Sequence, residues 1–244
     1  MILENWKVNI RDYDKAPKGD IYNRSYSILL KGNNRKSTIS SLLTNDFFVQ
    51  LVHFLKDFGM AKTMGKESAN LNNPKSFINR LKIRIESISG ALEILRKIPP
   101  EDFNPKDYRD LVFRCYSSLA EKSKTGLDSR NYTDPEGRTF AFDVGATKIL
   151  HAILPWHLII IDKYTAFSLQ HFYPNEFSYN KNYPTGHNFD KYMKGLIIAK
   201  IEVQNILEKQ NTDLWNNGLC GLPPFRIFDK CSWIKGKRIE NKKC

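Results

Sequence analysis

The sequence predicts a mainly α-helical fold, formed by residues 1–244 as one domain with two helical lobes. Six or more segments repeat apolar residues at steps of three and four, which is the period of an amphipathic helix. Strand signals are confined to the N-terminal segment, where we expect the minor β structure. At 244 residues the chain is long enough to bury a substantial core. The expected lobes are residues 38–139 and 140–244, preceded by the N-terminal segment.

Residues 1–36 are polar, with short apolar pieces at 21–22 and 26–30. Ser25-Tyr-Ser-Ile-Leu-Leu-Lys31, followed by Gly32-Asn-Asn34, predicts one strand and a turn. Arg35 and Lys36 come directly after that turn. They either contact a phosphate or belong to a solvated loop.

Three helices are predicted in the first lobe. Residues 38–58 are apolar on most sides, which indicates a central helix that ends at Gly59. A loop over 61–73 leads to a second helix, residues 74–98, and Pro105 opens a third. Cys115 lies on the apolar face of the third helix, so we interpret it as a core residue rather than a nucleophile.

The second lobe follows a polar, turn-rich stretch over residues 122–139. We expect a short helix at 146–153 that ends before Pro155, then a helix at 163–172. An aromatic loop over 173–187 precedes a long helix at about 188–209, and the chain ends in a basic tail.

The charge balance points to a polyanionic partner. The chain carries 38 lysine and arginine residues against 26 acids, a net charge of +12. Such an excess favours nucleic acid over a membrane surface, although a solvated basic surface is the plain alternative. The four cysteines have no C-x-x-C spacing, so we expect no metal site and no cofactor.

Nothing in the sequence predicts export or insertion into a membrane. Trp6, Lys7 and Asp12 interrupt any N-terminal apolar run, so no signal peptide is expected. The apolar run at 158–161 is far too short to cross a bilayer. We therefore expect a soluble cytoplasmic protein with reduced cysteines.

The stretch from Phe142 to Phe167 contains the main candidate site. Asp162 is the only acid between Val144 and Phe172, and it follows an apolar run at the head of a new helix. If Gly145 closes a tight turn, Lys148 lies in the first turn of the next helix, where free amides attract anions. In the plain alternatives Asp162 is only a helix cap and Lys148 is only an exposed helix residue.

This order of glycine turn, helix, lysine, loop and aspartate resembles that of helix-hairpin-helix DNA glycosylases. The resemblance covers about residues 140–170 and, more loosely, the helical frame. It implies a two-lobed glycosylase-like fold in which hairpin amides hold a DNA phosphate. By this resemblance Val144, Gly145, Thr147 and Lys163 would contact the DNA backbone. Asp162 would be the catalytic carboxylate, and Lys148 would attack the sugar C1′.

The chemistry of base excision explains these residue types. Cleavage of an N-glycosidic bond passes through an oxocarbenium-like sugar, which a nearby carboxylate stabilises. A deprotonated amine instead forms a Schiff base. The extruded base needs a pocket, for which we select Trp156, Tyr164, Trp233 and His151. Each aromatic ring, and His151 on its apolar helix, is otherwise explained as part of the core.

The sequence therefore predicts a monomeric DNA glycosylase that acts on double-stranded DNA with an extruded base. Its target would be an oxidised purine, or a bulky modified pyrimidine such as phage DNA contains, so its role would be repair or phage defence. A non-catalytic, basic, helical DNA-binding protein is the main alternative. A nuclease would need a carboxylate cluster for metal, and no Asp/Glu pair has convincing spacing. An RNA-directed role stays open, although no RNA-binding signature is present.

Overall fold

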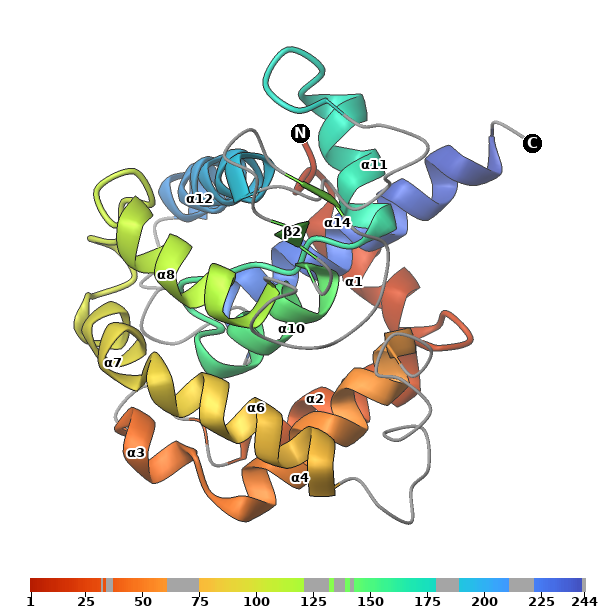
Figure 1. The fold of residues 1–244 in the computed structure, drawn as a ribbon. Coiled ribbons are helices and arrows are strands. Elements are labelled where there is room, and N and C mark those ends of the chain that lie inside the picture. The colour runs from red at the N-terminus through yellow and green to blue at the C-terminus, as the bar shows by residue number, and fades with distance from the viewer. Residues whose placement is uncertain are drawn as a thin grey trace.

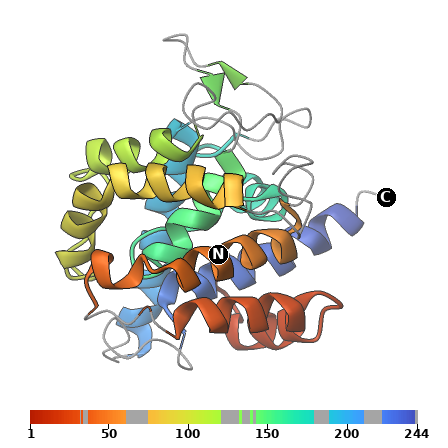
Figure 2. The same cartoon turned by 60° about the horizontal axis from the view of Figure 1, so that its bottom comes forward.

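The computed structural model describes residues 1–31, 33, 37–60, 75–120, 132–133, 139–140, 143–178, 189–210 and 222–242. This part of the chain is mainly α-helical, as predicted (Figures 1 and 2). The elements are α1 (Trp6–Asp14), α2 (Gly19–Leu30), α3 (Ile39–Leu42), α4 (Asn45–Leu55), the π-helix η1 (Lys56–Met60), α6 (Lys75–Ser87), α7 (Ser89–Lys97), α8 (Arg109–Ala120), β1 (Tyr132–Thr133), β2 (Thr139–Phe140), α10 (Asp143–Ile153), α11 (Lys163–Phe172), α12 (Phe189–Gln210) and α14 (Pro224–Asn241).

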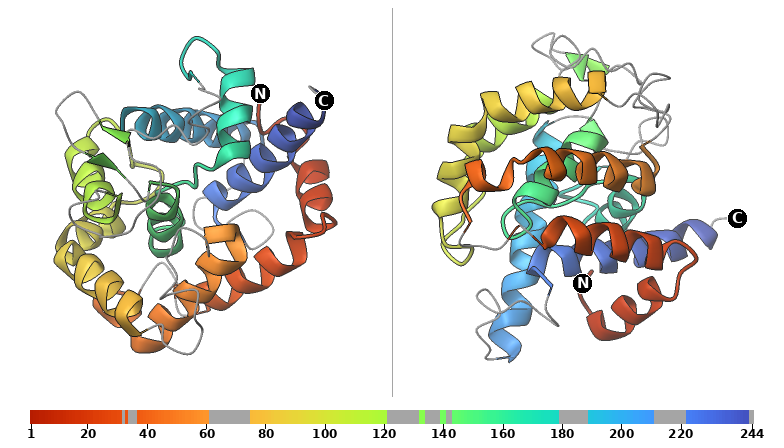
Figure 3. Two further views of the ribbon diagram at one scale, coloured as in Figure 1. Left: turned by 45° about the vertical axis from the view of Figure 1, so that its right-hand side comes forward. Right: turned by 90° about the horizontal axis from the view of Figure 1, so that it is seen from below.

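Helix α10 lies near the centre of the molecule, where it packs against α8, α4 and α2 (Figures 1 and 3). A second group forms around α14, which packs against α11, α1 and α12. The contact between α1 and α14 brings the first and last helices of the chain together. One buried apolar cluster runs through both groups and includes residues of both expected lobes, from Leu51 and Leu92 to Ile149 and Phe228.

The predicted strand near the N-terminus is wrong, because residues 19–30 form helix α2. The strand prediction rests on the short segment 25–31 and the Gly-Asn-Asn turn signal after it. The buried side chains Tyr22, Tyr26 and Leu29 instead follow steps of four and three, which is a helical face. The strands that the described residues contain are β1 and β2, a two-residue antiparallel pair in which Tyr132 faces Phe140.

Two predicted helices are each divided in the structure. Residues 38–58 form α3, α4 and η1, because Thr44 adopts an extended conformation and its hydroxyl accepts a hydrogen bond from the Phe47 amide. This starts a new helix, as a threonine N-cap does. Residues 74–98 form α6 and α7, with Ile88 between them. Helix α8 begins at Arg109, four residues after Pro105, behind a turn that Asn104 caps.

The second half of the chain confirms helices 163–172 and 188–209, which are α11 and α12. The predicted turn at Gly145 is wrong, because α10 begins at Asp143 and Gly145 lies inside it. The prediction of a basic tail after residue 209 is also wrong, because residues 224–241 form the long helix α14. The expected loop over 61–73, residues 179–187 of the aromatic loop, and Arg35 and Lys36 lie outside the described residues.

Cys115 is buried and free, as a core thiol should be, and burial raises its pKa to about 12. Among the described helices, none combines the length and the apolar character that crossing a membrane requires.

Candidate functional site

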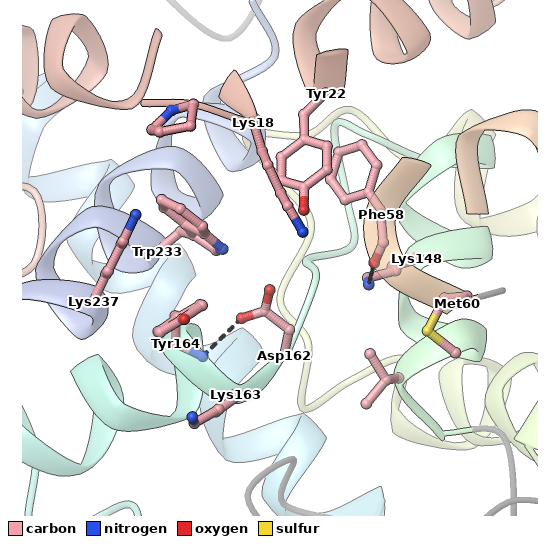
Figure 4. A pocket seen from close by; sticks show the side chains of 12 residues that line it. Lys18, Tyr22, Phe58, Met60, Lys148, Asp162, Lys163, Tyr164, Trp233 and Lys237 are labelled. Atoms are coloured by element: carbon pink, nitrogen blue, oxygen red, sulfur yellow. Dashed lines mark hydrogen bonds between the residues drawn. The ribbon is translucent and has the colours of Figure 1, made fainter. Parts of the chain in front are cut away.

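A cavity of about 430 Å³ opens where five helical elements meet. Its walls come from the turn between α1 and α2, from α2 itself, from η1, from α10, and from α11 and α14. The volume falls within the range of small-molecule sites. Figure 4 shows the twelve lining residues: Pro17, Lys18, Tyr22, Phe58, Met60, Val144, Lys148, Asp162, Lys163, Tyr164, Trp233 and Lys237.

Asp162 heads helix α11, as its position after an apolar run predicts. Its Oδ1 atom accepts hydrogen bonds from the backbone amides of Tyr164 and Thr165, both at 3.0 Å. These bonds satisfy orphan donors at the helix N-terminus and fix the carboxylate in one orientation. The half-buried side chain lines the cavity, and its Oδ2 accepts no hydrogen bond from a described residue. Asp162 is therefore both a cap and an acid open to the cavity.

Lys148 projects from the middle of α10 toward the same cavity. The residue is 4% exposed, and its ammonium donates a 2.6 Å hydrogen bond to the carbonyl oxygen of Phe58. Burial lowers the pKa of Lys148 below its usual value, against the attraction of Asp162 and Asp229. A buried amine with a lowered pKa has a larger neutral fraction at a given pH, which is the form that attacks carbonyl carbon.

The close crossing of α11 and α14 builds the opposite wall. A side chain at Gly236 would place its Cβ 1.9 Å from the backbone oxygen of Tyr164, so only glycine permits this approach. The crossing brings the Tyr164 and Trp233 rings edge to face, with centroids 5.0 Å apart. Two of the three aromatic residues selected for the base pocket, Tyr164 and Trp233, therefore line the cavity with Asp162 (Figure 4).

Helix α2 and η1 form another wall of the cavity. The rings of Tyr22 and Phe58 stack with their centroids 4.3 Å apart, and Met60 extends this apolar surface. A π-helix shifts the backbone relative to an α-helix, and such segments are frequent at functional sites. Here η1 supplies both the Phe58 ring and the carbonyl that holds Lys148.

A buried ion pair lies behind this wall. Arg226 and Asp229, three residues apart on α14, form a salt bridge in which both side chains are almost fully buried. Arg226 also donates to the Tyr13 hydroxyl at 3.2 Å and lies over the Tyr26 ring at 4.5 Å. Burial raises the pKa of Asp229 to about 6, against the attraction of Arg226. The pair connects α1, α2 and α14 in the layer that supports the cavity.

Four of the ten predicted site residues do not line the cavity: Gly145, Thr147, His151 and Trp156. Thr147 is 3% exposed, and its hydroxyl donates to the Val144 carbonyl and accepts from the Ile161 amide. Gly145 is buried inside α10, and Trp156 lies in the turn beyond the opposite end of that helix. Gly145 and Thr147 are therefore buried in the first half of α10, and neither lies at a glycine turn before that helix.

His151 belongs to the core and not to the pocket. Its Nδ1 lies 2.6 Å from the Leu158 carbonyl, and its Nε2 lies 3.0 Å from the Tyr26 hydroxyl. A carbonyl oxygen can only accept, so Nδ1 carries the proton and Nε2 accepts from Tyr26. Burial lowers the pKa of His151 to about 3, which keeps the ring neutral.

The other six predicted site residues line this one cavity: Asp162, Lys148, Val144, Lys163, Tyr164 and Trp233. Sequence reasoning missed six lining residues, which come from the N-terminal helices, η1 and the end of α14: Pro17, Lys18, Tyr22, Phe58, Met60 and Lys237. One usable signal was Pro224 at the first position of α14, where proline favours a helix start. The buried positions Phe225, Phe228 and Cys231 then follow a helical step.

Comparison of the chain with protein-family models, curated proteins and solved structures found no match. Within the described residues, no three His, Cys, Asp or Glu side chains are placed to share a metal ion.

Proposed function

We propose that this protein is a DNA glycosylase that removes a modified or damaged base and leaves an abasic site. One observation carries the proposal: a carboxylate and a buried amine open into the same cavity, whose walls are aromatic. Asp162 lines the cavity at the end of α11, Lys148 lines it from α10, and the rings of Tyr22, Tyr164 and Trp233 complete it. An extruded base needs aromatic or apolar surfaces of this kind against which to stack.

The hydrogen bonds of Asp162 support a role in the sugar chemistry. Two amide hydrogen bonds hold Oδ1, which leaves Oδ2 available to a positive charge that develops at C1′. Water then adds to C1′, while the base leaves with the bonding electron pair and takes up a proton. The carboxylate either stabilises the sugar cation or orients the water, which are the two roles such acids have in glycoside hydrolysis.

The Asp162→Asn variant tests this role with little risk to the fold. Asparagine caps a helix about as well as aspartate, so the variant keeps α11 and removes only the charge. Plasmid, damaged oligonucleotide and phage DNA are incubated with each protein, and abasic sites are detected by alkali cleavage. We expect base release to fall by at least about 100-fold. If the variant cleaves like the wild type, Asp162 is only a cap and the mechanism is wrong.

Lys148 distinguishes two modes of base removal. Its amine lines the same cavity as Asp162, and burial lowers its pKa against the attraction of that carboxylate. If it attacks C1′, borohydride traps a covalent protein–DNA adduct in the wild type, and Lys148→Met abolishes the adduct. If Lys148→Met keeps base release and the wild type gives no adduct, water is the nucleophile and the enzyme is monofunctional.

The second candidate function is a non-catalytic DNA-binding protein, which the net charge of +12 favours. Salt-dependent DNA binding with no abasic product from any DNA tested would support it. The choice of DNAs also separates the two target classes. Release from oxidised oligonucleotides indicates repair, and release from modified phage DNA indicates defence.

A further inference from the structure

Lys18 lines the cavity from the turn between α1 and α2, across the opening from Asp162. In Figure 4 its side chain extends beside the phenol of Tyr22 toward the side where Asp162 lies. Among the described residues, Lys18 has no ion-pair, hydrogen-bond or ring partner for its ammonium. Lys18 is exposed, so it lies at the open side of the cavity. Because lysine is a flexible donor of three hydrogen bonds, its ammonium is available to a ligand there.

The other three lysines of the cavity are already engaged. Lys148 donates to the Phe58 carbonyl. Lys163 forms a salt bridge with Glu240 at the back of the α11–α14 crossing. Lys237 lies over the Trp233 ring, 5.1 Å from its centroid. Lys18 is thus the cavity lysine whose ammonium has no partner among the described residues.

The turn that carries Lys18 is held firmly in place. A side chain at Gly19 would put its Cβ 2.0 Å from the Tyr13 carbonyl, so the chain passes too closely there for any other residue. The Tyr13 ring meets the Trp233 ring edge to face at 5.4 Å, which fixes α1 against the cavity wall. The Lys18 carbonyl accepts from the Tyr22 amide at 3.0 Å, which starts α2. Lys18 is therefore presented by a rigid turn.

We propose that Lys18 is the anion-binding residue of this cavity and receives the negative charge of the bound nucleotide opposite Asp162. The inference rests on the proposed function. The charge has two sources in a DNA substrate. One is the phosphate beside the extruded nucleotide, and the other is the departing base, which leaves with the electron pair of the broken C1′–N bond.

Two uncleavable duplexes separate these sources without any turnover. One contains a neutral tetrahydrofuran abasic analogue, and the other contains a cationic pyrrolidine analogue that imitates the sugar cation. Affinities are measured over a range of salt for the wild type, Lys18→Met and Lys18→Arg. The control is Lys97→Met on α7, because Lys97 is 76% exposed and α7 contributes nothing to the cavity.

If Lys18 binds a phosphate, Lys18→Met weakens both duplexes about tenfold at low salt, and Lys18→Arg restores them. The slope of log affinity against log salt then falls by about 1. If Lys18 faces the departing base, Lys18→Met changes the neutral duplex little and binds the cationic duplex more tightly, because a repulsive charge has gone. Either result supports the proposal.

The proposal is overturned if Lys18→Met binds both duplexes as the wild type and Lys97→Met do. These measurements are independent of base release. If the wild type binds DNA but releases no base, the proposed glycosylase activity is wrong. The binding measurements would still test whether Lys18 binds an anion. A wild type that binds neither duplex would reject both.

Discussion

Asp162 caps helix α11, and we propose that the same side chain also takes part in the sugar chemistry. Its two carboxylate oxygens are divided between these tasks, because Oδ1 accepts both amide hydrogen bonds and Oδ2 accepts none from the described residues. An N-cap contributes about 1 kcal/mol to stability. That contribution survives in Asp162→Asn, so a loss of activity without a loss of stability would separate the two tasks.

The burial of His151 predicts how the free energy of unfolding depends on pH. Its folded-state pKa of about 3 lies below the ordinary value of 6.5, because the ring is completely buried. The unfolded chain therefore binds a proton between these values that the folded chain does not. The free energy of unfolding should fall as the pH falls from 6.5 toward 3, by up to about 1.4 kcal/mol per pH unit from this group.

Denaturant unfolding at several pH values measures this effect. We expect His151→Gln to be destabilised at pH 7, since it loses two buried hydrogen bonds, and to show a shallower decline between pH 6.5 and 4. His53→Gln, on the exposed face of α4, is the control and should keep the wild-type slope. Equal slopes for wild type and His151→Gln would mean that the ring is not buried in the neutral form.

Single-residue predictions succeeded where the signal was local. Asp162 follows an apolar run and precedes a helix, and its role as a cap depends on those neighbours alone. The position of His151 depends on Tyr26, 125 residues away, and no periodicity encodes that contact. For the same reason the sequence could not show that the Thr147 hydroxyl accepts a hydrogen bond from the Ile161 amide, or that Lys18 lines the cavity.

At the scale of elements, the crossing of α11 and α14 determines the site. Gly236→Ala would force the new Cβ against the Tyr164 backbone, which cannot move without displacing the start of α11. We expect a loss of about 1–3 kcal/mol in unfolding free energy and a displaced Asp162. Gly90→Ala is the matched control, because nothing lies within 4 Å of its added Cβ. That variant should be neutral or gain up to about 1 kcal/mol.

Melting temperature and base release are measured for both variants to test whether α11 and α14 cross this closely. A fall in melting temperature and in activity for Gly236→Ala alone supports the close crossing. Equal stability of the two variants would contradict this close crossing, in which an added Cβ at Gly236 lies 1.9 Å from the backbone oxygen of Tyr164.

Elements with strong periodicity were predictable, and those without it were not. Helices α11 and α12 follow their sequence patterns within a residue. The division of residues 38–58 came from Thr44, whose cap interrupts an otherwise continuous apolar pattern. Helix α14 was missed because its many basic residues resemble a solvated tail, although residues such as Arg226 and Lys230 are buried and paired.

At the scale of the whole molecule, one buried carboxylate joins the N-terminal segment to the second half of the chain. Glu202 on α12 is fully buried and accepts hydrogen bonds from the amides of Ile2 and Leu3, at 2.6 and 3.2 Å. The Tyr173 hydroxyl, just beyond α11, donates to the same carboxylate. The N-terminal segment is thereby held against the second half of the chain, where α1 packs on α14. The support behind the cavity thus depends on contacts between residues about two hundred positions apart in sequence.

The Glu202→Ala variant should therefore lower the free energy of unfolding by about 2–4 kcal/mol, because two buried amides and the partly buried Tyr173 hydroxyl lose their acceptor. Glu208→Ala, on the exposed face of the same helix, should change it by less than about 0.5 kcal/mol. Since one apolar cluster joins both halves, circular dichroism and tryptophan fluorescence should follow a single transition in both variants. A second, earlier transition seen only by tryptophan fluorescence in Glu202→Ala would mean that the N-terminal helices unfold as a separate unit. In that case Lys18 and Tyr22 would leave the cavity before the core unfolds, and DNA binding would be lost at the first transition.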